Sequence, residues 1–136
     1  MPSIVVKPFV LSDVDLTLGD AGYEAHVSTA QFVPTTPMVV WKGLTPTATF
    51  TDVGAASWAL NLSYAQDWAT SDSLSQYLFD NQGQTVTCVF APSAGGSSFT
   101  ADIVILPGSI GGAVDTTAVA TVALGVSGQV TRVVVV

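Results

Sequence analysis

The sequence predicts a mainly β fold: an antiparallel β-sandwich or barrel-like fold with one short flanking α-helix. The chain is rich in Val and Thr, and its apolar residues recur mostly at every second position, which is typical of strands with one buried face. Only one segment has helical spacing. A chain of 136 residues has the length of one domain, so we expect residues 1–136 to fold as a single unit.

The clearest alternation runs over residues 58–64, where apolar and polar side chains take opposite faces of one expected strand. Residues 13–18 and 23–28 alternate equally well. A glycine-containing turn signal at residues 19–22 separates them, so the two runs predict a hairpin. In this hairpin Glu24 would lie on the polar face of the second strand.

Further strands are expected over residues 85–90 and 99–105, and a long, nearly all-apolar strand over residues 118–126. A strand with two apolar faces is expected where both faces are covered. These strands predict a core made of Leu16, Trp58, Leu60, Leu62, Val86, Phe90, Ile103 and Ile105.

One helix is expected at about residues 72–81. Leu74 and Leu78 lie four positions apart, so they share a face, and Ser73 with Gln76 fits a capping box at the start. Such a short helix depends on packing rather than on intrinsic propensity.

Several segments have no regular pattern. Residues 34–57 are rich in Pro and Gly and contain one short strand candidate, residues 38–41. Residues 107–117 also read as an irregular loop. The first 12 residues form an expected arm, and residues 130–136 an expected tail. Long ordered loops in a small domain are usually functional.

The charge composition is unusual. Only 10% of the residues are charged, against about 25% in ordinary soluble domains. Ten acidic residues face three basic ones, for a formal net charge of −7. So few charges indicate that other subunits cover much of the surface, although the acidity also fits a simple role in solubility. An acidic chain repels nucleic acid rather than binding it.

The sequence offers no catalytic, cofactor or metal site. His26 and Cys88 are the only residues of their types, and the alternation around Cys88 predicts a buried, inert thiol. His26 is expected to be exposed or hydrogen-bonded. Asp13 and Asp15 share a strand face where calcium could bind, but no calcium-binding loop motif accompanies them. A single cysteine excludes an internal disulfide and fits assembly in a cytoplasm.

No apolar stretch approaches the ~20 residues of a membrane-spanning helix, and the apolar part of the N-terminus is too short for a signal peptide. The tryptophans Trp41, Trp58 and Trp68 are candidates for a sugar-binding platform. Core packing is the favoured prediction for Trp58, because it lies on the core face of its strand, and Trp68 is expected to cover the helix.

The order of these features along the chain resembles that of a known family. It comprises Asp13-Val14-Asp15-Leu16, Val40-Trp41-Lys42-Gly43-Leu44-Thr45-Pro46, Tyr64-Ala65-Gln66-Asp67-Trp68, Ser73-Leu74-Ser75-Gln76-Tyr77-Leu78, Phe90-Ala91-Pro92 and Ile110-Gly111-Gly112. Over nearly the whole chain this order resembles the tail tube (major tail) proteins of siphophages, phages with long, non-contractile tails, and particularly those infecting actinobacteria.

The resemblance implies a structural virion protein that is assembled in the host cytoplasm, with no enzymatic activity and no membrane. Six subunits would form a ring whose sheets merge into one barrel. Rings would stack around a tape measure protein, with tail-end proteins at the tip, and DNA would later pass through without specific binding. The arm (residues 1–12) and the region 34–57 would contact neighbouring rings.

The resemblance also implies a negatively charged lumen. Glu24 and Asp102 are the leading lumen candidates, because each is expected on the polar face of an alternating strand. Asp52, in the loop region, is a third. These acids could instead solvate an outer wall. The alternative function is an Ig-like or carbohydrate-binding module on a virion or cell surface.

Overall fold

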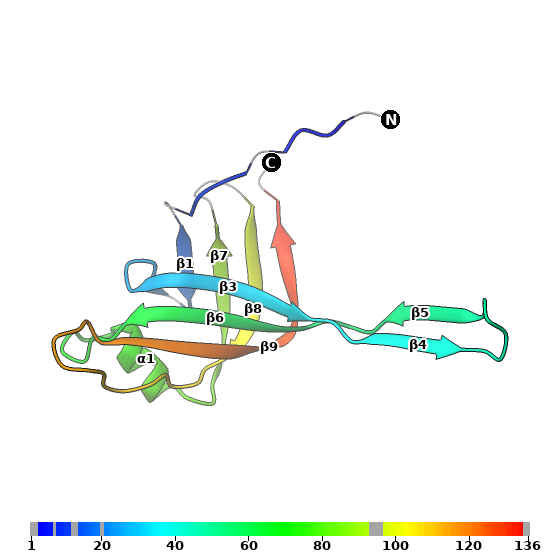
Figure 1. Ribbon diagram of the computed structural model, residues 1–136. Coiled ribbons are helices and arrows are strands. Elements are labelled where there is room, and N and C mark those ends of the chain that lie inside the picture. Colours follow the sequence, from blue (N-terminus) through cyan, green and yellow to red (C-terminus); the bar gives the residue numbers. More distant parts are fainter. Residues whose placement is uncertain (1–2, 7, 12–13, 20, 93–96, 135–136) are drawn as a thin grey trace.

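The computed structural model describes residues 3–6, 8–11, 14–19, 21–92 and 97–134. Seven strands form one curled antiparallel sheet in the order β2-β1-β7-β8-β9-β6-β3, and β4 and β5 form a separate hairpin (Figure 1). The elements are β1 (Asp15–Leu18), β2 (Ala21–Gly22), β3 (Val27–Thr35), β4 (Met38–Lys42), β5 (Thr49–Val53), β6 (Ser57–Ala65), α1 (Leu74–Asp80), β7 (Thr85–Ala91), β8 (Ser98–Val104) and β9 (Val119–Val133). The mainly β prediction is confirmed.

The sheet curls because β9 belongs to two layers. Its first half pairs with β6, up to the Ala59–Gly125 pair, and its second half pairs with β8 from the Ile103–Val126 pair onward. A register shift follows in the β8–β9 ladder, where Gly128 has a φ of 94°, a conformation that suits glycine at an irregular point of a strand. In Figure 1, β3, β6 and the first half of β9 cross over β1, β7 and β8, which gives a half-barrel.

β9 is longer than the sequence suggests. The predicted strand over 118–126 continues to Val133, so the expectation of a tail over 130–136 is wrong for residues 130–133. Residues 135–136 lie outside the described residues. Gly125 and Gly128 lie where the strand passes from one layer to the other.

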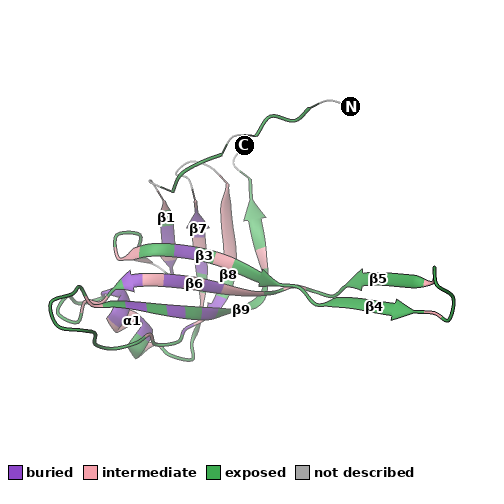
Figure 2. Cartoon of the chain, viewed as in Figure 1, coloured by how far each residue is buried: buried purple, intermediate pink, exposed green. Residues whose placement is uncertain are grey.

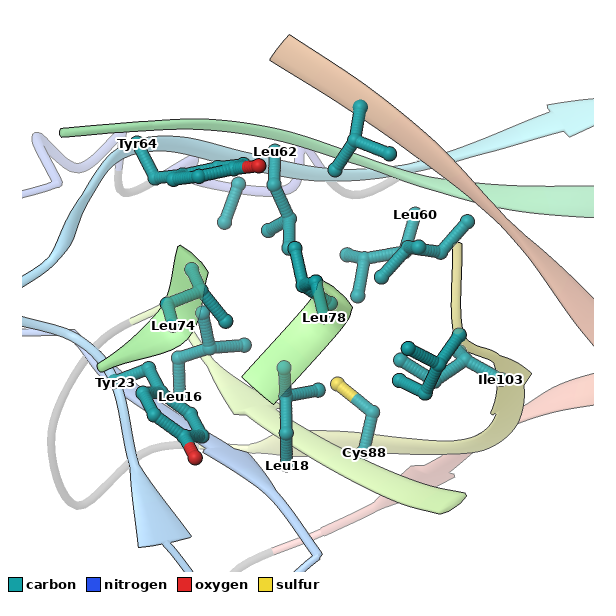
Figure 3. Close-up of a cluster of buried hydrophobic side chains, with 14 of the residues drawn as sticks. Leu16, Leu18, Tyr23, Leu60, Leu62, Tyr64, Leu74, Leu78, Cys88 and Ile103 are labelled. Carbon is teal, nitrogen blue, oxygen red and sulfur yellow. The ribbon is translucent and has the colours of Figure 1, made fainter. Parts of the chain in front are cut away.

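The core fills the space between the two layers (Figure 3). Six of the eight predicted core residues are buried, with at most 6% of the side chain exposed: Leu16, Leu60, Leu62, Phe90, Ile103 and Ile105. Val86 is only partly buried against this cluster. The prediction for Trp58 is wrong. It is half-buried at the rim, where its indole Nε1 donates to Gln129 Oε1 at 3.0 Å, because a buried indole N–H needs an acceptor.

The helix α1 lies within the predicted range. Ser73 Oγ accepts a hydrogen bond from the amide of Gln76 at 3.4 Å, but the side chain of Gln76 donates to the carbonyl of Trp68 at 2.7 Å, so only half of the capping box forms. Leu74 and Leu78 are fully buried. They point into the space between the layers (Figure 3), so α1 is held by packing.

The predicted strand over residues 23–28 is wrong for residues 23–26, whereas residues 27–28 begin β3. β2 contains only Ala21 and Gly22, and a turn follows in which the amide of His26 donates to the carbonyl of Tyr23 at 2.9 Å. The Tyr23 side chain is only 2% exposed and fills the core. Burial of this aromatic ring in the core stabilises the turn. Glu24 therefore lies on a turn.

The expectation of an irregular segment over residues 34–57 is wrong for most of its length. β4 and β5 pair in register from Met38–Val53 to Lys42–Thr49. Every residue of both strands is exposed, and the hairpin projects from the body (Figure 2). The amide of Gly54 donates to the carbonyl of Pro37 at 2.9 Å, closing the base of the hairpin.

Replacing Leu60 by Ala is expected to lower the free energy of unfolding by about 2–5 kcal/mol, the usual range for a buried leucine. Leu60 is fully buried in the middle of β6. Urea denaturation of dilute protein measures the change. The matched control is Leu44→Ala, because Leu44 is fully exposed in the β4–β5 connection and should change the stability by less than about 0.5 kcal/mol. Equal effects of the two substitutions would contradict the core assignment.

Candidate interaction surfaces

The outward face of β1, β7, β8 and the second half of β9 carries many hydroxyl groups, with Val89, Val104 and Val133 among them. Their alternate residues, such as Leu16, Cys88 and Ile103, point into the core, so the intervening residues point outward. Cross-strand pairing places these residues in rows, for example Thr87–Asp102–Ser127. The polar members of this surface, the hydroxyl face, are Asp15, Thr17, Thr85, Thr87, Ser98, Thr100, Asp102, Ser127 and Thr131. None of these residues is basic.

The structure separates the three acidic lumen candidates. Asp102 is exposed on the hydroxyl face, and its Oδ1 accepts a hydrogen bond from Thr87 Oγ1 at 3.1 Å. Its expected position on the polar face of a strand is confirmed. Glu24 is exposed on the turn after β2, where its Oε2 accepts from the amide of Leu16 at 3.4 Å. Asp52 lies on β5, and its Oδ1 accepts from the amide of Val53 at 2.8 Å. Asp15, which sequence reasoning did not assign to the lumen, shares the hydroxyl face with Asp102.

The β4–β5 hairpin has two different faces. One face, the aromatic face, contains the cross-strand pairs Val39–Asp52 and Trp41–Phe50. The rings of Trp41 and Phe50 lie 5.7 Å apart between centroids. The opposite face contains Lys42 and aliphatic and threonine side chains. Because both faces are exposed, the body of the same chain buries neither.

The N-terminal arm is extended and apolar. Ile4, Val5 and Val6 are each at least 79% exposed. Farther along, Phe9 and Leu11 line a groove at the open side of the half-barrel, beside Phe90. An apolar arm with so little contact to its own domain is a candidate for contact with another chain.

The three tryptophans do not form one platform. Trp41 lies on the hairpin, and Trp58 lies at the rim of the core. Trp68 packs edge-on against Phe79 of α1, with ring centroids 6.0 Å apart, which confirms the expected contact with the helix. The hairpin and α1 lie at opposite ends of the molecule (Figure 1).

Cys88 and His26 are the cysteine and the histidine of the chain, and both are at least partly buried. Burial raises the pKa of the Cys88 thiol to about 12, so the reactive thiolate is scarce at neutral pH. The expected buried position of Cys88 is confirmed. His26 is half-buried beside Tyr23, with ring centroids 5.7 Å apart, and its Nδ1 has no hydrogen-bond partner in the described part of the chain.

The sequence suggests a calcium position between Asp13 and Asp15, but Asp13 lies outside the described residues. Within the ranges that are described, no three His, Cys, Asp or Glu side chains group together as metal ligands. No helix in those ranges has the length and apolar character needed to cross a membrane.

The hydroxyl face, the hairpin and the arm are thus the surfaces with functional potential. Each has a composition that a surface serving only solubility does not need. The hydroxyl face has hydroxyls and acids without a base, and the hairpin and the arm expose apolar side chains. No protein-family model matches the chain, and no curated protein matches it in sequence.

Proposed function

We propose that the chain is a structural subunit of a phage tail tube. Copies assemble into rings, which the resemblance implies are hexamers, and the rings stack into a hollow tube whose acidic lumen conducts DNA. The order of features along the sequence resembles that of this family. The single observation that carries the proposal is the uncovered β4–β5 hairpin.

The hairpin is hard to explain in a monomer. A lone two-stranded hairpin is marginally stable in water. This one exposes Met38, Trp41, Phe50 and Val53 by more than 60% each, and Lys42 and Asp52 are the only charged residues on its strands. Burying such apolar surface against another subunit is favourable by about 25 cal/mol per Å². Assembly with further copies accounts for the hairpin and for the low charge of the chain together.

The sheet offers edges for closing a ring. β2 and β3 are the two terminal strands of the seven-stranded order, and each pairs on one side only among the described strands. Free edges are ready to pair with another chain. Pairing between neighbouring copies would extend the sheet around a ring and remove both edges.

The hydroxyl face is the proposed lumen wall. It presents hydroxyls, with Asp102 and Asp15 as its charges and no base. Duplex DNA carries one negative charge per ~1.7 Å of axis, so a wall of this kind repels phosphate while remaining hydrated. Glu24 borders this layer at its β2 edge and adds to the same negative potential. The opposing possibility is that these acids face outward and only solvate the tube.

Electron microscopy of concentrated, negatively stained protein tests the proposal. Hollow tubes of uniform diameter are expected, with rings or larger species on size-exclusion chromatography. The partners in the virion would be further copies of the chain, a tape measure protein and tail-end proteins, as the resemblance implies. A monomer at every concentration would contradict the proposal and favour a surface-binding module.

A further inference from the structure

A preformed apolar pocket opens at the rim of the half-barrel. It has a volume of about 180 Å³ and is lined by Phe32, Trp58, Phe90, Pro92, Phe99 and Val130, which we call the aromatic pocket. Trp58 is fixed in its wall, because its Nε1 donates to Gln129 Oε1 at 3.0 Å and Gln129 Nε2 in turn donates to the carbonyl of Ala56 at 2.6 Å. Phe32 and Phe90 meet edge-on, with ring centroids 6.2 Å apart. The pocket therefore needs little rearrangement to accept a ligand.

The size and chemistry of the pocket fit one aromatic side chain. A cavity of about 150 Å³ accepts benzene, whereas sites for drug-sized ligands start at about 300 Å³. None of the lining residues is charged. A side chain of a protein partner is thus a better match than a free polar ligand.

Two exposed aromatic side chains of the chain could fill such a pocket. Phe9 already lines the adjoining groove of its own domain, whereas Phe50 lies out of reach of the pocket in its own chain. Phe50 is 64% exposed on the aromatic face of the hairpin. It lies eight positions before Trp58 along an extended segment, or about 26 Å at 3.3 Å per residue. The hairpin points away from the body (Figure 1). A second copy of the chain can bring its hairpin to this pocket, whereas the first copy cannot.

Charges beside the two surfaces are complementary. Arg132 lies opposite Phe99 in the β8–β9 ladder, so its side chain emerges next to the pocket on the same face. Asp52 lies two residues after Phe50, on the same face of the hairpin. Both are exposed, and neither forms an ion pair with any described residue. Phe50 and Asp52 are two residues apart on one strand, and so are Val130 and Arg132. Each pair therefore spans about 7 Å, so the charges can meet when Phe50 lies beside Val130.

We propose that Phe50 of one copy fills the aromatic pocket of a second copy, and that Asp52 of the first pairs with Arg132 of the second. The contact joins two different surfaces, so it is heterologous and repeats from copy to copy. This contact rests on the proposed function, because a tail tube is an assembly in which the same contact repeats. It identifies the aromatic pocket as the surface that binds the hairpin of a neighbouring copy.

A charge exchange tests the contact. Asp52→Arg places two bases against each other, and Arg132→Asp places two acids. Each single variant should raise the critical concentration for assembly roughly tenfold or more, since apposed like charges cost several kcal/mol and 1.4 kcal/mol is tenfold. The double variant Asp52→Arg/Arg132→Asp should assemble at nearly the wild-type concentration. A mixture of the two single variants should also assemble, because each hairpin then meets an opposite charge on the other variant.

Sedimentation measures the critical concentration, and circular dichroism checks that each variant folds. Asp80→Arg is the matched control, since it makes the same charge change at the exposed end of α1 and should assemble like wild type. Phe50→Ala should weaken assembly, and combining it with Asp52→Arg/Arg132→Asp should not restore assembly. Failure of the double variant and of the mixture to recover assembly would overturn the contact.

Microscopy of the same samples separates the two proposals. Tubes that form normally in both single variants would overturn the contact and leave the tail-tube function intact. Rescue by charge exchange in assemblies that are not hollow would support the contact and contradict the tube. Wild-type protein that stays monomeric would overturn both.

Discussion

Deleting residues 2–8 is expected to leave a folded protein that no longer makes long tubes. The described part of this segment is extended, with Ile4, Val5 and Val6 at least 79% exposed. The buried core cluster begins only at Leu16. The deletion therefore removes apolar surface that is available to neighbouring copies but no side chain of the core. Thermal unfolding of dilute protein should stay within a few degrees of wild type, because about 1 kcal/mol corresponds to a shift of only a few degrees in a domain of this size.

Electron micrographs and melting curves of the deletion variant check this expectation. A full-length control with Ile4→Ser and Val6→Ser keeps the chain length and removes only apolar side chains, so it should lose tubes as well. Normal tubes from the deletion variant would show that the arm has no part in assembly. A large loss of thermal stability would show instead that the arm packs on its own domain.

The strands that bury one face were predictable from the sequence. β6, β7 and β8 each place alternate residues in the core, because a two-layered sheet requires period-two patterning wherever one face is wet. The helix was predictable for a related reason. Leu74 and Leu78 are fully buried, and the polar Gln76 between them breaks the period-two alternation that a buried strand face would show.

The errors arose where a local pattern has two structural solutions. The alternation over residues 23–28 is equally compatible with a turn in which Tyr23 is buried. Pro34 suggested the start of an irregular segment, but it lies within β3, a strand at the edge of the sheet, where the missing N–H removes no ladder bond. Fully exposed strands such as β4 and β5 have no burial pattern to detect, since the rest of the fold buries none of their residues.

The candidate surfaces were only partly predictable for the same reason. The exposure of Asp102 follows from the alternation of β8. The hydroxyl face does not, because strands β1, β7, β8 and β9 must first be placed in register. The proximity of Arg132 to the aromatic pocket depends on the β8–β9 pairing, and this strand was expected to end at residue 126. Sequence spacing carries none of this information.

Replacing Asp102 by Lys is expected to slow the release of DNA from assembled particles. Asp102 is exposed near the middle of the hydroxyl face, and the substitution changes two charge units in every subunit. In a tube of stacked rings the new lysines would form a positive lining along the whole path of the DNA. Even a small attraction per ring, summed over many rings, would hold the duplex, since phosphate contacts dominate such binding.

The dependence on salt distinguishes this mechanism from damage to the tube. Screening shortens the reach of a charge from about 30 Å at 0.01 M salt to about 10 Å at 0.1 M, so added salt should restore the release rate of the Asp102→Lys particles. Asp80→Lys is the matched control: it makes the same change at the end of α1, off the hydroxyl face, and should release DNA like wild type. Glu24→Lys should have a smaller effect, because Glu24 lies on a turn at the border of that face. Release from intact Asp102→Lys tubes at the wild-type rate in low salt would place the hydroxyl face on the outside of the tube.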